Sequence, residues 1–290
     1  MFFQLKISLP AALREPVTAV LYDMGCEGIE EKDDALIAYF PDSASLDEIR
    51  DALSGFDGLS FSNEAVEEKD WQAEWKERFE CVRAAGFLIC PPWKAPSLPA
   101  PPAGEKLLLL DPGNAFGAGD HVTTLTVLKL LKKWADKQEN LKENLNTKSL
   151  LDLGTGTGIL AIGACMMGVG DVTAVDTDAS SVEATENNFA LNGLAGKARI
   201  IHGDIRDAGA GYDVVLANIF LEPLLELMHL ISAVLKPGGT LIISGLLVGQ
   251  EEAVLREADR EGLLIVESVI ENGWFSATLT LTAGHVLGRS

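Results

Sequence analysis

The sequence lacks the long apolar segments that would place it in a membrane. No run of apolar residues in its 290 positions approaches the length of about 18 that a spanning helix needs. Its first residues also lack the basic region and apolar stretch of an export signal, so we expect a cytoplasmic protein. With 47% hydrophobic and 23% charged residues, the composition is that of a globular chain with one large domain, or a large and a small one.

Cysteine is scarce and shows no metal-binding spacing. The chain has four cysteines, at Cys26, Cys81, Cys90 and Cys165, and no C-x-x-C pair. We therefore predict neither a disulfide framework nor a metal site, which fits a reducing cytoplasm.

Basic residues are also few. The chain has 23 Lys and Arg against 43 Asp and Glu, which gives a net charge of −20. This balance argues against a broad phosphate-binding surface, so no direct nucleic-acid binding is expected. It suits a basic partner such as a lysine-rich protein, although improved solubility alone would also explain it.

The first part of the chain has the pattern of a small separate domain. Residues 1–64 show the order β-α-β-β-α-β, with a helix capped by Ser45, which is the ferredoxin-like pattern. This segment contains no chemical motif, so we expect it to serve substrate recognition. The charged residues 65–80 are predicted to form a linker helix, and 81–290 a second domain. Its proline-rich residues 91–104 should form an extended loop.

From residue 148 onward, strand and helix patterns alternate. Strands are expected near 149–153, 171–176, 198–202, 212–218, 239–244, 263–270 and 275–282, with helices near 158–167, 178–191, 222–235 and 249–260. Such alternation predicts an α/β fold with a seven-stranded Rossmann-like sheet covered by helices on both faces. The last two strands are too close in sequence for a parallel crossover and should pair antiparallel. Before this region, a helix is expected over 125–134 and a polar surface connection over 136–148.

A glycine turn follows the first of these strands. Gly154, Gly156 and Gly158 form G-x-G-x-G, whereas a dinucleotide fingerprint has its third glycine one position later. Asp152 precedes the turn, where a carboxylate would repel a pyrophosphate but favour the ammonium group of a methionine moiety. The pattern therefore predicts S-adenosylmethionine as the cofactor, with methyl transfer as the reaction.

Two further carboxylates end neighbouring strands. Asp176 can accept hydrogen bonds from ribose hydroxyls, and Asp204 from an adenine amino group, although a turn residue is the alternative for Asp204. Asp178 is the better candidate for the N-cap of the following helix.

Two other segments carry candidate site residues. Residues 111–124 contain three glycines and a hydroxyl-rich helix start, which makes a loop able to fold over a ligand, or only a loop and a cap. Asn218 follows a buried run at the end of the expected fourth strand.

These three segments together resemble the ribosomal protein L-eleven methyltransferase family, the PrmA type. The loop matches the family pattern P-G-x-A-F-G-T-G-x-H-x-T-T, the turn matches D-x-G-x-G-S-G-I-L-A-I, and the strand end matches N-I-L-x-x-P-L. The resemblance covers most of the chain, including two linker tryptophans, Trp71 and Trp75. One departure is Phe220-Leu221-Glu222, in a loop that should border the incoming amine.

The resemblance implies a function and a set of site residues. The family is a class I S-adenosylmethionine-dependent methyltransferase that acts on lysine side chains and the N-terminal amine of a basic ribosomal protein, and we expect a monomer. The residues that match the family's cofactor contacts are Thr124, Gly154, Asp176 and Asn218, with Phe116 over the cofactor and Trp274 near the site. The patterns described above add Gly156 and Asp152 at the glycine turn and Asp204 at the end of a neighbouring strand.

An attacking lysine amine must be neutral, and a partly buried site beside a sulfonium would lower its pKa. We therefore expect no dedicated base and assign Asn218 the catalytic role of orienting the amine. Alternatives are a methyltransferase of the same fold acting on another protein, on RNA or on a small molecule, a cofactor-binding scaffold, and a nicotinamide oxidoreductase. The absence of a Pro-Pro pair after Asn218 disfavours a nucleic-acid or glutamine acceptor.

Overall fold

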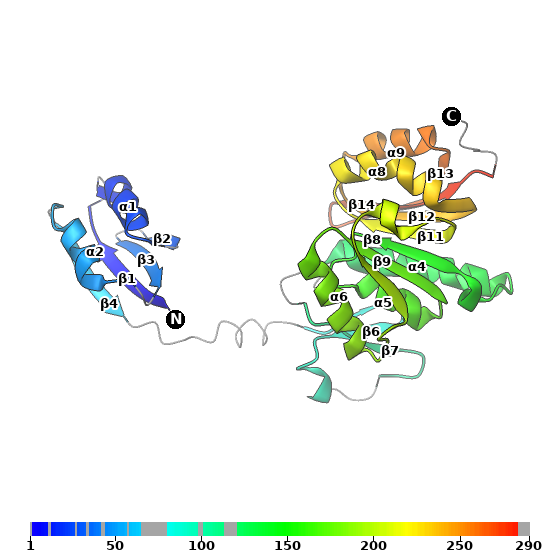
Figure 1. Cartoon of the computed structure of the whole chain (residues 1–290), viewed down its shortest axis with the longest axis horizontal. Helices are drawn as coiled ribbons and strands as arrows, with labels where there is room; N and C mark the ends of the chain where they lie inside the picture. Colours follow the sequence, from blue (N-terminus) through cyan, green and yellow to red (C-terminus); the bar gives the residue numbers. More distant parts are fainter. Residues whose placement is uncertain are drawn as a thin grey trace. The chain divides into compact units, whose positions relative to one another are not determined.

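A computed structural model describes residues 2–10, 13–26, 28–32, 35–41, 44–56, 58–64, 80–97, 101–112 and 121–283. The chain divides into two compact units, Met1–Arg78 and Phe79–Ser290 (Figure 1). No helix in the described part of the chain is both long and apolar enough to cross a membrane.

The first unit is a four-stranded antiparallel sheet with two helices. Its elements are β1 (Phe2–Ser8), α1 (Arg14–Asp23), β2 (Gly28–Lys32), β3 (Ala35–Pro41), α2 (Leu46–Leu53) and β4 (Ser60–Glu64), and the strand order is β2-β3-β1-β4. Ser45 caps α2 by accepting a hydrogen bond from the Glu48 amide, as its sequence predicted. Alternate residues of the strands, such as Leu5 and Ile7 in β1, are fully buried in a core shared with both helices.

The second unit is built on a mixed seven-stranded sheet. Its strands are β8 (Ser149–Leu153), β9 (Asp171–Asp176), β10 (Ala198–His202), β11 (Tyr212–Asn218), β12 (Leu235–Leu247), β13 (Leu263–Glu271) and β14 (Trp274–Leu281), in the order β10-β9-β8-β11-β12-β14-β13. The first five strands in this order run parallel to one another, and β14 pairs antiparallel with both β12 and β13. The predicted antiparallel pairing of the last two strands is therefore confirmed.

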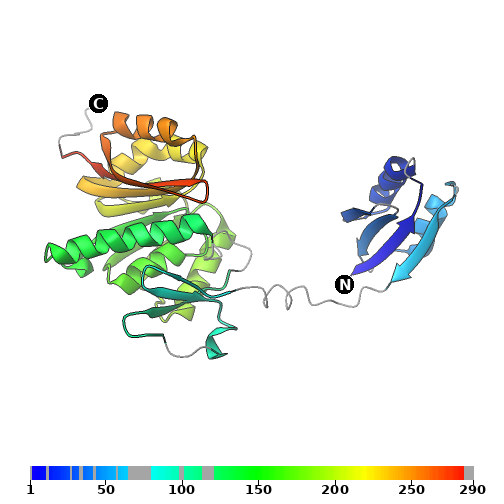
Figure 2. The ribbon, with the colours of Figure 1, turned by 180° about the vertical axis from the view of Figure 1, so that it is seen from behind.

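Helices cover both faces of this sheet. They are α4 (Val122–Asn140), α5 (Ile159–Met167), α6 (Ala179–Leu191), α7 (Ile205–Ala208), α8 (Leu221–Val234) and α9 (Glu251–Arg260), with a short 3-10 turn η3 (Leu145–Thr147) before β8. Side chains of α4, α5 and α6 pack on one face and those of α7, α8 and α9 on the other. Figure 2 shows the long green helix α4 crossing its face of the sheet. Consecutive residues of β8, Leu150 and Leu151, are both fully buried, because they point into the two different cores.

A second, three-stranded sheet joins the core on the α4 side. It consists of β5 (Val82–Ala84), β6 (Phe87–Cys90) and β7 (Lys106–Leu109), with a 3-10 turn η2 (Ala95–Ser97) in the proline-rich loop. The sequence did not predict these strands, because runs of three or four residues are too short to show a clear alternation. Likewise α4 extends to Asn140, so the polar connection expected over 136–148 is partly helix.

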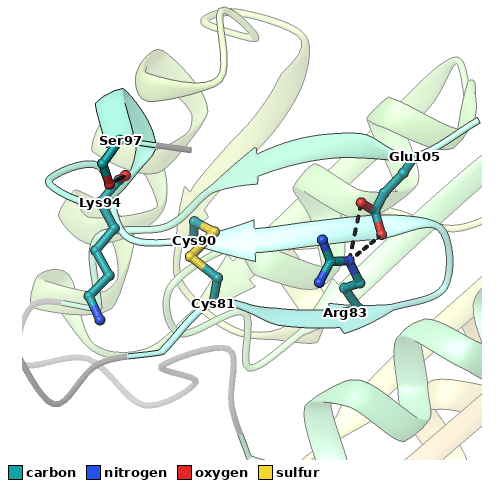
Figure 3. Close-up of a disulfide and its surroundings, with 6 residues drawn as sticks. All are labelled: Cys81, Arg83, Cys90, Lys94, Ser97 and Glu105. Atoms are coloured by element: carbon teal, nitrogen blue, oxygen red, sulfur yellow. Dashed lines mark hydrogen bonds and ion pairs between the residues drawn. A yellow bond between two sulfur atoms is a disulfide. The ribbon is translucent and has the colours of Figure 1, made fainter. Parts of the chain in front are cut away.

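The prediction that the cysteines form no disulfide is wrong for one pair. Cys81 and Cys90 form a disulfide across the open end of the β5–β6 hairpin, with their Cα atoms 4.5 Å apart (Figure 3). The sequence did not reveal the pair because only the unpredicted hairpin places the two residues opposite each other. Cys26 and Cys165 take no part in this disulfide.

Candidate active site

The glycine turn lies between β8 and α5 and requires its glycines. Gly154, Gly156 and Gly158 all have positive φ, at 71°, 57° and 81°. Space is limiting as well, because a Cβ on Gly154 would lie 2.8 Å from Ile219 Cγ2. The turn can therefore adopt this path, and a ligand can approach its backbone closely, only without side chains at these positions.

Asp176 connects the glycine turn to the next strand. Its Oδ2 accepts a hydrogen bond from the Gly156 amide at 2.9 Å, and its Oδ1 accepts one from the Asp178 amide at 3.0 Å. The residue is half-buried at the carboxyl end of β9 and lines the main cavity. Its carboxylate is thus held in one orientation at the cavity wall.

Asp152 lies behind the turn instead of on the cavity wall. It is fully buried, and its Oδ2 accepts hydrogen bonds from Thr155 Oγ1 at 2.7 Å and from the Ala161 amide at 3.2 Å. Its Oδ1 has no partner among the residues that the structure describes. Burial raises the pKa of this carboxyl to about 7. Asp152 braces the turn against α5, and its expected interaction with a ligand ammonium, directly or through water, stays a prediction.

Asp178 and Asp204 are both helix caps. Asp178 accepts a hydrogen bond from the Ser180 amide at 2.9 Å and begins α6, which confirms its predicted role. Asp204 begins α7 in a capping box and pairs with Arg206, whose hydrogen bond lowers the pKa of the Asp204 carboxyl. Asp204 also lines the cavity, as an adenine contact would require. The cap fits the alternative of a turn residue, because both carboxylate oxygens already have partners.

Asn218 ends β11 with an unsatisfied oxygen. Its Nδ2 donates to Thr124 Oγ1 at 3.4 Å, and its buried Oδ1 has no partner in the described part of the chain. Thr124 is itself buried in the first turn of α4. A buried amide oxygen without a donor is costly, so this atom marks a place for a donor from a ligand.

These residues surround a cavity of about 670 Å³ at the carboxyl ends of the parallel strands. Its walls include Gly154, Gly156, Asp176, Asp204, Asn218, Phe220, Pro223, Leu227, His121 and Trp274. Thr124 lies behind the wall, in contact with Asn218. Phe116 falls in residues 113–120, outside the described residues.

His121 is a cavity residue to which the sequence reasoning gave no role. It caps α4 by accepting a hydrogen bond at Nδ1 from the Thr123 amide, and its ring meets Trp274 edge-on with centroids 5.1 Å apart. The same Nδ1 lies 2.8 Å from Thr123 Oγ1, so this ring nitrogen is engaged by the start of α4. The signal that could have found it is its place just before a helix start, where a capping side chain is expected.

Comparisons with known proteins agree on one family. Residues 29–282 match the family described as "Ribosomal protein L11 methyltransferase (PrmA)". A ribosomal protein L11 methyltransferase from Teredinibacter turnerae is 36% identical over 244 residues, which cover 83% of this chain and 77% of the relative. Another from Dictyoglomus thermophilum is 30% identical over 308 residues, which cover 95% of this chain and 97% of the relative.

A solved structure shares the fold. The ribosomal protein L11 methylase from Lactobacillus delbrueckii subsp. bulgaricus superposes with a TM-score of 0.61 at 27% identity, over 70% of this chain and all of the other.

Proposed function

Because this chain belongs to the ribosomal protein L11 methyltransferase family, we propose that it transfers methyl groups from S-adenosylmethionine to amino groups of ribosomal protein L11. The observation that carries the proposal is the buried, unpartnered Asn218 Oδ1 on the same cavity as the Asp176 carboxylate. The Asn218 oxygen can accept a hydrogen bond from the amine that receives the methyl group. The Asp176 carboxylate can accept hydrogen bonds from the ribose hydroxyls of the methyl donor.

The described residues fit this cofactor. Gly154 and Gly156 give it close access to the backbone, and Asp176 accepts from its ribose. Asp204 borders the adenine, while Thr124 supports Asn218 and Asp152 braces the turn. Phe116 is proposed to cover the cofactor by its family resemblance alone.

When bound, the cofactor supplies a methyl group on a positively charged sulfonium, and the protein must align and desolvate the acceptor. Asn218 Oδ1 accepts a hydrogen bond from the acceptor amine and directs its lone pair at the methyl group. A half-enclosed cavity beside a cation lowers the pKa of the amine, so it enters the reaction neutral. Asp176 is engaged by two backbone amides and His121 by its cap, so neither serves as the base.

The acceptors are the lysine side chains and N-terminal amine of L11. A net charge of −20 favours encounter with such a basic protein and disfavours RNA. The order β2-β3-β1-β4 in the first unit supports a ferredoxin-like recognition domain over residues 1–64, followed by a linker over 65–80 and the catalytic domain over 81–290.

The enzyme is proposed to act as a monomer in the cytoplasm, where ribosomal proteins are made. Thiols are kept reduced there, so Cys81 and Cys90 would be joined only under oxidising conditions.

The test is transfer of tritium from labelled S-adenosylmethionine to purified L11 and, separately, to ribosomal RNA. Label in L11 supports the proposal, and label in RNA alone, or in neither, contradicts it. Asn218→Ala should weaken cofactor binding and lower turnover, each by about tenfold, because a buried polar partner is lost. Asn146→Ala, which removes an exposed amide before β8, is the matched control and should leave both unchanged.

A further inference from the structure

Three large apolar side chains are exposed at the cavity end of the sheet. Phe220, Leu247 and Val248 are 63%, 50% and 51% exposed. We refer to these three residues as the apolar ledge. Exposed apolar groups that gather beside a cavity mark interaction sites more often than scattered ones do.

The pairing of the strands places the apolar ledge next to the cavity wall. Leu247 lies opposite Trp274 in the β12–β14 ladder, and the Val248 amide donates to the Gly273 carbonyl at 3.0 Å. A Cβ on Gly245, two residues before Leu247, would lie 2.7 Å from the Ile219 carbonyl oxygen, so this strand end lies beside Phe220. Since Trp274 and Phe220 both line the cavity, the ledge continues the cavity wall onto the surface.

The surroundings of the ledge are acidic. The three segments at and beside it, residues 219–226, 244–252 and 270–275, contain five glutamates and no lysine or arginine. Glu271 pairs with Lys129 at 3.1 Å and Glu252 with Arg256 at 2.5 Å, whereas Glu222, Glu226 and Glu251 have no ion pair among the described residues. An occupant must therefore present apolar side chains framed by positive charge.

We propose that the apolar ledge is the docking surface for the segment of the protein substrate that surrounds the target amine, and that this segment carries apolar side chains flanked by basic residues. The inference rests on the proposed function, since it assumes a protein acceptor at this cavity. The ledge would hold the backbone of the acceptor while its lysine enters toward Asn218. It would therefore control the affinity for the folded acceptor and leave the chemical step alone.

The test is steady-state methylation of full-length L11 by the single variants Leu247→Ser and Val248→Ser and by the double variant. We expect KM for L11 to rise about tenfold with kcat and the Kd for S-adenosylmethionine unchanged, because a few central apolar contacts dominate interface affinity. Leu141→Ser is the matched control. Leu141 is 60% exposed but follows the last turn of α4, about 28 Å along the helix from its start at the cavity.

The outcomes separate the two proposals. If the unmodified enzyme methylates L11 and the ledge variants keep its KM within twofold, the docking surface is wrong and the function stands. A rise in KM that Leu141→Ser shows equally also contradicts the docking surface. If the unmodified enzyme does not methylate L11, the function fails and the ledge proposal fails with it. Unchanged melting temperatures confirm that the variants fold, as expected for exposed side chains.

Discussion

At the carboxyl ends of the parallel strands, the cavity of about 670 Å³ is lined by Asn218, whose Oδ1 has no partner among the described residues. A cavity of about 420 Å³ at their amino ends is lined mostly by paired charges. In the second cavity, Lys236 Nζ lies 2.6 Å and Lys148 Nζ 3.6 Å from the oxygens of Asp213. Lys133 pairs with Glu267 at 2.8 Å.

The comparison shows that a cavity is a better candidate for a ligand site when one of its buried polar atoms lacks a hydrogen-bond partner. Most charges at the amino end are paired with one another, so a ligand there would have to displace a partner. At the carboxyl end, Asn218 Oδ1 has no partner among the described residues, and a ligand can supply one. We expect substitutions at the first cavity to alter binding and substitutions at the second to alter stability.

The largest effect is expected at Asp176. Asp176→Ala removes the acceptor that faces the cavity and releases the Gly156 amide, so the Kd for S-adenosylmethionine should rise about a hundredfold, the loss of a charge-assisted hydrogen-bond pair. Isothermal titration calorimetry measures this change. A Kd within threefold of the unmodified protein would remove Asp176 from the site.

A smaller effect, on stability alone, is expected at Asp213. Asp213→Ala leaves Lys236 and the half-buried Lys148 without that partner, and it also removes the acceptor for the Ser149 amide, so the free energy of unfolding should fall by about 2 kcal/mol. Urea denaturation measures this, with the cofactor Kd as the control that should not move. A change in the cofactor Kd would contradict the difference between the two cavities. Stabilisation of the unmodified protein by inorganic phosphate, through the exposed Lys137 in the second cavity, would contradict it as well.

The smallest change, about 1 kcal/mol over one pH unit, is expected from the pH dependence of stability at Asp152. Because burial raises its pKa in the folded state to about 7, the folded protein keeps a proton that the unfolded chain loses near pH 4. The stabilisation by this group is complete below that pH and is lost as pH rises toward 7, at a rate of about 1 kcal/mol per pH unit. Asp152→Asn should remove this slope from urea denaturation at pH 5, 6 and 7. An equal slope in both proteins would show that Asp152 is ionised in the fold.

Much of the sheet and its cavity could be predicted from the sequence, because the signals are local. Continuous apolar runs predict the strands that are buried on both faces, such as β8 and β11, and glycines at positive φ follow directly from the G-x-G-x-G pattern. Since parallel strands end at one edge of a sheet, Asp176 and Asn218 were expected to meet there, and both do line one cavity.

What the sequence could not show depends on contacts between distant segments. Whether Asp152 faces a ligand or the start of α5 is decided by the path of the turn, since Ala161 lies nine residues away. The His121–Trp274 contact joins residues 153 positions apart, and no local pattern marks it. The Cys81–Cys90 pair depended on a hairpin whose strands are too short to be recognised.

That pair has a mechanical consequence. Cys81 stands directly before β5, and the hairpin is open at this end, so tension along the preceding chain would peel β5 from β6 one hydrogen bond after another. Unzipping of this kind needs little force, because the bonds break singly. With the sulfurs joined, the same tension reaches β6 at once, and β6 is anchored by its parallel pairing with β7 and by Phe87 and Ile89 in the core. The oxidation state of Cys81 and Cys90 would thus decide whether a pulling force on the chain is resisted by β5 alone or by the whole second unit.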